Sequence, residues 1–341
     1  MNNLLLKGDN LEALKYLRDT LDMRGKVDLV YIDPPFATGG EFKADSSGRI
    51  ATISSSADGE VAYSDKLKGE AFIEFLRERI EVLYDLLSDR GSFYLHIDYK
   101  IGHYVKVMLD SVFGIENFRN DITRIKCNPK NFSRVGYGNI KDMILFYTKG
   151  KPIWHEPRVP MTEEEIAKLY TKVDKNGRRY TTVPIHAPGE TKNGASSQMF
   201  KGLLPPPGRH WRCSVEELEE LDRKGLIEWS SSGNPRKINY ADDHLTKKMQ
   251  DIWEFKDPTN PIYPTEKNHD MLRTIIEASS DENSIVMDCF AGSGGTLIEA
   301  ARLGRQWIGV DQSEIAIKTI KKNIASSKDI FSKDTFDYIE L

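Results

Sequence analysis

The sequence contains only three cysteines in 341 residues, Cys127, Cys213 and Cys289, and they lie far apart. That number and spacing fit neither a disulfide framework nor a metal site, so we predict no bound metal. The sequence also lacks an apolar run of the roughly 20 residues that a membrane-spanning helix requires. Its first residues lack the charged leader and apolar segment of a signal peptide. These absences argue against a secreted or membrane protein and predict one of the cytoplasm.

An excess of positive charge is also absent, since the formal net charge is −4. The distribution of charge is nevertheless uneven. Residues 119–212 carry +10 and the rest of the chain carries −14, counting Lys and Arg against Asp and Glu. Such asymmetry is typical of a polyanion-binding region attached to an acidic body. From charge alone, DNA or RNA binding and a merely solvated basic surface both remain open.

Strands and helices alternate at both ends of the chain. A short apolar strand at 4–6 precedes a helix, and 28–32 reads as a buried strand. Apolar residues at helical spacing predict helices over 70–88, 100–113, 269–280, 295–304 and 314–325. Strands are predicted over 92–98, 284–290 and 306–311, and 43–65 reads as a long loop. This alternation predicts one parallel, Rossmann-like α/β sheet.

The regular pattern fails in the basic middle of the chain, which we interpret as an insertion. The predicted domain organisation is therefore a first half of the sheet domain, a basic insertion and a second half of the sheet domain. The boundaries are 1–118, 119–240 and 241–341.

A glycine-rich turn follows the predicted strand "SIVMDCF" in the C-terminal part. Gly292, Gly294 and Gly295 let the backbone turn sharply and expose helix N–H groups to a ligand. Asp311 follows the next strand, where an acid commonly accepts hydrogen bonds from ribose hydroxyls. The motif predicts an adenosine-containing cofactor, and by itself leaves NAD and S-adenosylmethionine as alternatives.

The stretch "DLVYIDPPF" ends a buried strand in Asp33-Pro34-Pro35-Phe36. The exocyclic amine of adenine or cytosine is a poor nucleophile, because its lone pair is delocalised into the ring. A carboxylate and a carbonyl held rigid by proline can accept its N–H protons in the transition state, and a neighbouring aromatic ring can stack on a flipped-out base. In isolation the tetrapeptide would read as a simple turn.

Several spaced motifs together identify a family. "GDNLEAL", "DPPF", "FIEFLRERIEVLYDLLSDRGSFYLHID", "YPTEKN" and "DCFAGSGG…ARLGRQWIGVDQSEIAI" occur in an order that resembles the β class of DNA amino-methyltransferases. The chain is especially similar to the catalytic part of type III modification subunits, over about residues 4–150 and 204–325. The resemblance implies site-specific transfer of a methyl group from S-adenosyl-L-methionine to the N6 amine of a flipped-out adenine in double-stranded DNA.

The resemblance also implies roles for individual residues. Asp33 and the Pro34 carbonyl, made rigid by Pro35, would hold the target amine while Phe36 stacks on the base. Asp9 would accept from the cofactor's adenine amine, and Asp311 would hold its ribose. The other expected cofactor-binding residues are Thr265, Lys267, Asp288, Phe290, Gly292 and Gly294. "YPTEKN" departs from the His-Pro-Thr-Gln-Lys-Pro usual in the family, as do Cys289 and Gly295 from the usual Pro and Thr.

The basic insertion supplies the expected DNA contacts. They are Arg124, Lys126, Lys130, Arg134, Arg209, Trp211 and Arg212. For Trp211 a buried hydrophobic role within the insertion is an equal alternative, and His96 is interpreted as a structural histidine.

Other functions remain as alternatives. Relatives that methylate the N4 amine of cytosine more often carry Ser-Pro-Pro, so Asp33 favours adenine. A catalytically silent DNA-binding relative and a nicotinamide dehydrogenase are the other readings, although the second leaves "DPPF" unexplained. Further expectations from the resemblance are a prokaryotic cell, a cognate restriction endonuclease and a homodimer.

Overall fold

The computed structural model describes residues 2–35, 41–44, 50–52, 60–64, 69–129, 135–191, 193–231, 233–258, 267–326 and 335–341. Two compact units divide the chain: residues 1–157 with 250–341, and residues 158–249. The second unit does not coincide with the expected insertion at 119–240, since residues 119–157 belong to the first unit and residues 241–249 to the second. Within the described residues, no helix is long and apolar enough to cross a lipid bilayer.

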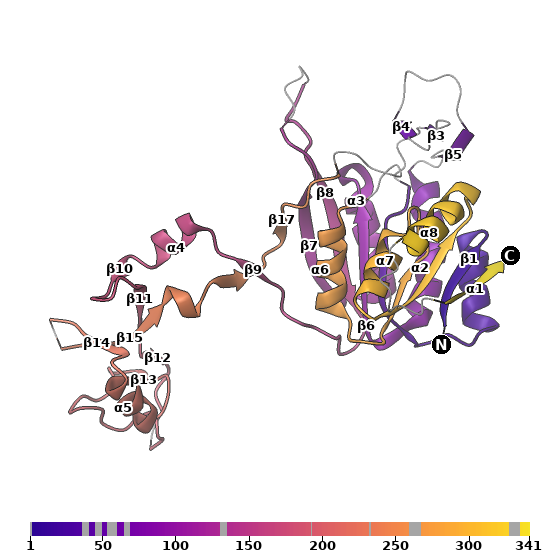
Figure 1. Cartoon of the computed structure of the whole chain (residues 1–341). Helices are drawn as coiled ribbons and strands as arrows, with labels where there is room; N and C mark the ends of the chain where they lie inside the picture. The colour runs from indigo at the N-terminus through magenta and orange to yellow at the C-terminus, as the bar shows by residue number, and fades with distance from the viewer. Residues whose placement is uncertain are drawn as a thin grey trace. The chain divides into compact units, whose positions relative to one another are not determined.

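The first unit is built on a nine-stranded sheet. Its strands are β1 (Asn3–Lys7), β2 (Val27–Ile32), β6 (Leu87–Ile97), β7 (Phe118–Ile125), β8 (Lys141–Thr148), β17 (Ile252–Trp253), β18 (Ile285–Asp288), β19 (Gln306–Asp311) and β20 (Phe336–Glu340). The spatial order is β17-β7-β8-β6-β2-β18-β19-β1-β20 (Figure 1). Neighbours pair in parallel except where β8 lies between β6 and β7. The expected α/β sheet is thus confirmed, with one antiparallel strand added.

Helices cover both faces of this sheet. They are α1 (Asn10–Asp19), α2 (Glu70–Leu86), α3 (Tyr99–Phe113), the short η1 (Ile115–Asn117), α6 (His269–Ser279), α7 (Gly295–Arg302) and α8 (Glu314–Ser326). Apolar residues of α1, α2 and α3 pack on one face of β2 and β6. On the opposite face, α6 is joined to β6 by a 2.8 Å hydrogen bond between Tyr94 and Ser279.

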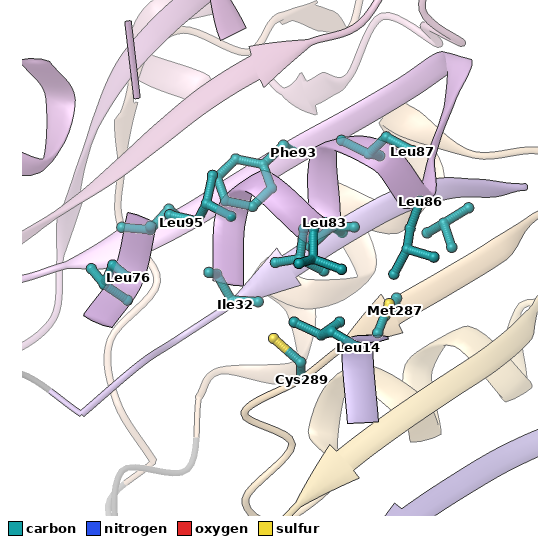
Figure 2. Close-up of a cluster of buried hydrophobic side chains, with 14 of the residues drawn as sticks. Leu14, Ile32, Leu76, Leu83, Leu86, Leu87, Phe93, Leu95, Met287 and Cys289 are labelled. Carbon is teal, nitrogen blue, oxygen red and sulfur yellow. The ribbon is translucent and has the colours of Figure 1, made fainter. Parts of the chain in front are cut away.

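The core of the first unit lies between α1, α2 and the sheet. Figure 2 shows Leu14, Leu76 and Leu83 of the helices against Ile32, Phe93 and Leu95 of the strands, beside Met287 and Cys289. Phe72, Leu76, Ile80 and Leu83 recur at helical spacing, and each is buried. Fully burying such side chains contributes about 1.5–3 kcal/mol each. The ends of β2 and β18 are therefore held on a rigid support.

The segment expected as a long loop contains strands. They are β3 (Glu41–Ala44), β4 (Ile50–Thr52) and β5 (Glu60–Ser64), paired antiparallel in the order β4-β3-β5. The Ser, Gly and Asp content of this segment favoured a loop in the prediction, although short stretches such as "EVAYS" form strands that pair with one another.

The second unit is a small, mainly antiparallel domain. Its elements are β9 (Arg158–Pro160), α4 (Glu163–Leu169), β10 (Lys172–Val173), β11 (Arg179–Pro184), β12 (His186–Pro188), β13 (Arg209–Trp211), α5 (Val215–Arg223), β14 (Ile227–Trp229), β15 (Pro235–Tyr240), η2 (Ala241–Asp243) and β16 (Thr246–Lys248). Strands β10, β11, β15 and β14 form one sheet, and β9 pairs with β16 where the chain enters and leaves the unit. Phe200, Trp211 and Leu218 are central to its own apolar core.

Candidate active site

Three carboxylates stand at the ends of neighbouring parallel strands. Asp33 follows β2, Asp288 ends β18 and Asp311 ends β19. Because β2, β18 and β19 are adjacent and parallel, their carboxyl ends meet at one edge of the sheet. Ligands of open α/β sheets bind outside this edge. The topology therefore brings the two motifs found in the sequence to one place.

The glycine-rich turn is shaped by two of these carboxylates. Gly292 N donates to Asp311 Oδ2 at 2.9 Å, and Phe290 N donates to Asp288 Oδ1 at 3.0 Å. Gly294 has a φ of 81°, and a Cβ there would lie 3.0 Å from Ile320. Glycine at 294 is thus required both by the backbone conformation and by the packing of α8. The turn leads directly into the N-terminus of α7.

Burial changes the acidity of both carboxyl groups. It raises the pKa of Asp288 to about 7, against the hydrogen bonds from Phe290 N–H and the Thr296 hydroxyl. Burial also raises the pKa of Asp311, while the N–H groups of Ser313 and Gly292 act in the opposite direction. Asp288 is therefore an internal support of the turn, and Asp311 is partly exposed beside it.

Asp33 has one paired and one unpaired oxygen. Its Oδ2 lies 2.7 Å from Lys267 Nζ, and both side chains are largely buried, 15% and 11% exposed. Its Oδ1 is buried and has no hydrogen-bond partner among the described residues. A buried carboxylate oxygen without a donor is costly, so this atom fits an incoming N–H group. Lys267, expected as a cofactor ligand, is the counter-ion of Asp33 in this structure.

The remaining expected catalytic residues are only partly described. Pro34 is buried and Pro35 partly buried beside Asp33, whereas Phe36 and Thr265 lie outside the described residues.

Asp9 caps the helix that follows β1. Its Oδ1 accepts from the N–H groups of Leu11 and Glu12, and its Oδ2 accepts from Arg79 at 3.2 Å. The side chain is still 50% exposed, so lone pairs remain for a ligand. Asp9 therefore caps the helix, and the cofactor-binding role expected for it stays a prediction.

Arg79 is a buried cation that the sequence analysis missed. It is 4% exposed on α2, donates to Asp9 and to Asn10 Oδ1, and lies 3.6 Å from the centre of the Phe75 ring. Phe75 in turn packs against Phe290, with ring centres 6.3 Å apart. A charged residue inside the apolar pattern of residues 72–83 was the available signal. Through these contacts Arg79 and Phe75 connect Asp9 with Phe290, two residues expected to bind the cofactor.

A buried polar chain crosses the sheet beside Asp33. Tyr31 Oη lies 2.9 Å from His96 Nδ1, and His96 Nε2 lies 3.2 Å from Asp142 Oδ2. A carboxylate accepts only, so Nε2 carries the proton and Nδ1 accepts from the tyrosine. Burial lowers the pKa of His96 and keeps it neutral, while His96 and Lys126 hold the pKa of Asp142 below its usual range despite burial. The structural interpretation of His96 agrees with this arrangement.

Arg124 corrects one expected DNA contact. It is fully buried, pairs with Asp142 and Asp257, and donates to the Phe255 carbonyl at 2.8 Å. A side chain enclosed in this way cannot reach a phosphate. Lys126 also pairs with Asp142, at 2.6 Å, but remains partly exposed. Lys130 and Arg134 lie outside the described residues.

Trp211 also differs from the DNA-contact assignment. It is 2% exposed, contacts the Phe200 ring edge-on and donates its indole N–H to the Gln198 carbonyl at 2.9 Å. Of the two interpretations, the buried hydrophobic role is the one that the structure supports. Its neighbours Arg209 and Arg212 are exposed on the surface of the second unit.

The arrangement was compared with known proteins. A family model described as DNA methylase matches residues 27–322. The chain belongs to the DNA methylase family. The type II methyltransferase M.EcaI of Enterobacter cloacae is 42% identical over 331 residues, which cover 95% of this chain and 69% of that protein. The type III StyLTI Mod subunit of Salmonella typhimurium is 25% identical, with 86% of this chain and 49% of that protein covered.

The fold is shared with solved structures as well. The crystal structure of the complex of M1.HpyAVI with S-adenosylmethionine has a TM-score of 0.50 at 17% identity, covering 94% of this chain and 98% of that one. The expected methyltransferase fold is therefore confirmed. This family of DNA methylases depends on S-adenosyl-L-methionine, which confirms the predicted cofactor. The chain spans about half the length of the type III subunit, so a DNA methylase domain is the part that the two share.

Proposed function

We propose that this DNA methylase transfers a methyl group to the N6 amine of a flipped-out adenine in double-stranded DNA. The observation that carries the proposal is the state of Asp33. Lys267 fixes one carboxylate oxygen at 2.7 Å, and the other is buried with no donor among the residues that the structure describes. Adenine is preferred over cytosine because Asp33 heads an Asp-Pro-Pro sequence.

The residues of this chain would act mainly by positioning and charge. Asp33 Oδ1 would accept one N–H of the amine and the Pro34 carbonyl the other, favouring a pyramidal nitrogen whose lone pair is no longer delocalised into the ring. Lys267 would hold the carboxylate in the orientation that leaves Oδ1 free. When bound, S-adenosylmethionine supplies an electrophilic methyl group on a sulfonium. Asp9, Phe290, Gly292 and Asp311 would hold it at the adjacent strand ends.

The first test is transfer of labelled methyl to mixed genomic DNA, followed by digestion to nucleosides. Label in N6-methyladenine is expected. Label in N4-methylcytosine would keep the role of Asp33 and replace the target base. No label, despite binding of S-adenosylhomocysteine measured by calorimetry, would contradict the proposal and support a silent DNA-binding relative.

Two variants then test the role of the ion pair. Asp33→Asn is expected to lower kcat by about 100- to 1000-fold, the range seen when a transition-state hydrogen-bonding group is removed. Lys267→Met should lower it about 10- to 100-fold, since a hydrogen bond to a charged group contributes about 1.5–3 kcal/mol. Lys26→Met, at the opposite end of β2, is the matched control. Both active-site variants should bind S-adenosylhomocysteine with an affinity within about threefold of wild type. A larger loss of affinity would indicate that Asp33 or Lys267 binds the cofactor.

The wider biology follows from the relatives. The type III relatives are named restriction-modification enzymes, and we propose a cognate restriction endonuclease and a place in the cytoplasm of a prokaryotic cell. DNA prepared from cells that express the chain should resist that endonuclease, and DNA from Asp33→Asn cells should not. The homodimer stays a prediction, which sedimentation analysis would test.

A further inference from the structure

The connection between β7 and β8 leaves the sheet at the edge that carries Asp33. Ile125 at the end of β7 pairs with Lys141 at the start of β8, and β8 runs antiparallel to β6. Since β6 is parallel to β2, the end of β7 and the end of β2 lie on the same edge. Strands β2, β6 and β8 are neighbours, so β8 lies two strand spacings, about 10 Å, from β2 across the sheet. The register places Lys141 about three residues beyond the level of Asp33 in the direction of this edge. Figure 1 shows the described parts of this connection, residues 126–129 and 135–140, extending beyond the strands.

Two large side chains of this connection are almost fully exposed in the part of the chain that the structure describes. Val135 and Tyr137 are 105% and 98% exposed, the two highest values among the large apolar residues that the structure describes. Gly136 between them has a φ of 107°. Because neither side chain is buried, the first unit gains nothing from them for its stability. Both side chains are therefore available to contact a binding partner.

The charge of the same stretch indicates which partner. Residues 126–141 contain four basic residues, Lys126, Lys130, Arg134 and Lys141, and no acid. Lys256 adds a further cation at the base, where its Nζ donates to Asn128 Oδ1 at 2.7 Å. Exposed apolar side chains in a stretch of sequence with only basic charges match DNA, which offers phosphates outside and stacked bases inside.

We propose that Tyr137, with Val135, enters the duplex beside the target and fills the gap that the flipped-out base leaves. The inference rests on the proposed function and adds a residue that lowers the free-energy cost of flipping the base out of the duplex. Tyr137 precedes Lys141 by four residues, so an extended backbone carries it up to about 13 Å beyond the sheet. That exceeds the depth of the major groove, about 8.5 Å. A stacked aromatic ring offsets part of the unstacking cost.

The test compares two duplexes built around a site that the wild-type enzyme methylates in genomic DNA. In one the target base is paired normally, and in the other it faces a mismatched base, which makes extrusion easier. Tyr137→Ala should lower kcat/KM about 10- to 100-fold on the paired duplex and less than threefold on the mismatched one. Tyr137→Phe should stay within threefold on both. Tyr104→Ala, which removes another exposed tyrosine on α3, is the matched control.

The outcomes separate this inference from the proposed function. An equal loss on both duplexes would mean that Tyr137 supplies affinity only, and no loss on either would mean that it has no role. Either result overturns the inference while methylation by wild type upholds the function. If wild type methylates no DNA, both fail. Thermal unfolding of each variant is expected to match wild type, because neither tyrosine is buried.

Discussion

Asp288 offers a quantitative test of the buried carboxyl group beneath the glycine-rich turn. In the folded protein burial raises its pKa to about 7, from the usual value of 3.8 for an aspartic acid. The folded state therefore holds a proton that the unfolded chain releases at lower pH. The stabilisation is fully present below about pH 3.8, and it is lost as the pH rises to about 7. Each pKa unit corresponds to 1.36 kcal/mol, so the full effect is about 4 kcal/mol.

The perturbation is Asp288→Asn, which removes the titration and keeps both hydrogen bonds. The amide oxygen can accept from Phe290 N–H, and the amide nitrogen can donate to the Thr296 hydroxyl. Relative to this variant, the wild-type free energy of unfolding should fall by about 2.5 kcal/mol between pH 5 and 8. It should change by less than about 0.2 kcal/mol between pH 8 and 9.

The assay is urea unfolding of both proteins, without cofactor, at unit intervals from pH 5 to 9. Taking the difference between them cancels the titration of all other groups. Asp121→Asn, on the exposed side of β7, is the control and should show a difference that varies by less than about 0.5 kcal/mol. A wild-type to Asp288→Asn difference that is flat, or that rises between pH 5 and 8, would refute the reasoning.

Two other substitutions test the corrected DNA contacts. Arg124→Met should lower the free energy of unfolding by about 3 kcal/mol, because Asp142, which is buried, and Asp257 both lose the arginine as an ion-pair partner. The affinity for DNA should stay within about twofold of wild type. Filter binding and urea unfolding check this, and a weaker DNA complex with unchanged stability would restore the original assignment. Trp211→Ala should cost about 3–5 kcal/mol in the second unit, seen as faster proteolysis of residues 158–249, with S-adenosylhomocysteine affinity unchanged. Resistance to protease equal to wild type would show that the side chain is dispensable for packing.

Much of the site could be predicted from local sequence, because each part is a strand end followed by a special turn. The glycines of residues 292–295 and the prolines after Asp33 restrict the backbone wherever they occur, so their meaning is readable without a fold. Their meeting at one sheet edge also follows, since parallel strands place all their carboxyl ends together. The ion-pair partner of Asp33 could not be predicted, because Lys267 is far from it in the chain.

The sequence by itself determined the alternation of strands and helices, the glycine-rich turn and the position of Asp33, the carboxylate that we propose as catalytic. All of these depend on near neighbours in the chain. Tertiary structure alone decided that Arg124 is enclosed by carboxylates, that Trp211 forms a core and that β8 runs antiparallel within the sheet. Charge and aromatic character predict what a side chain can bind. Whether it faces solvent depends on contacts between segments distant in sequence, which no local pattern specifies.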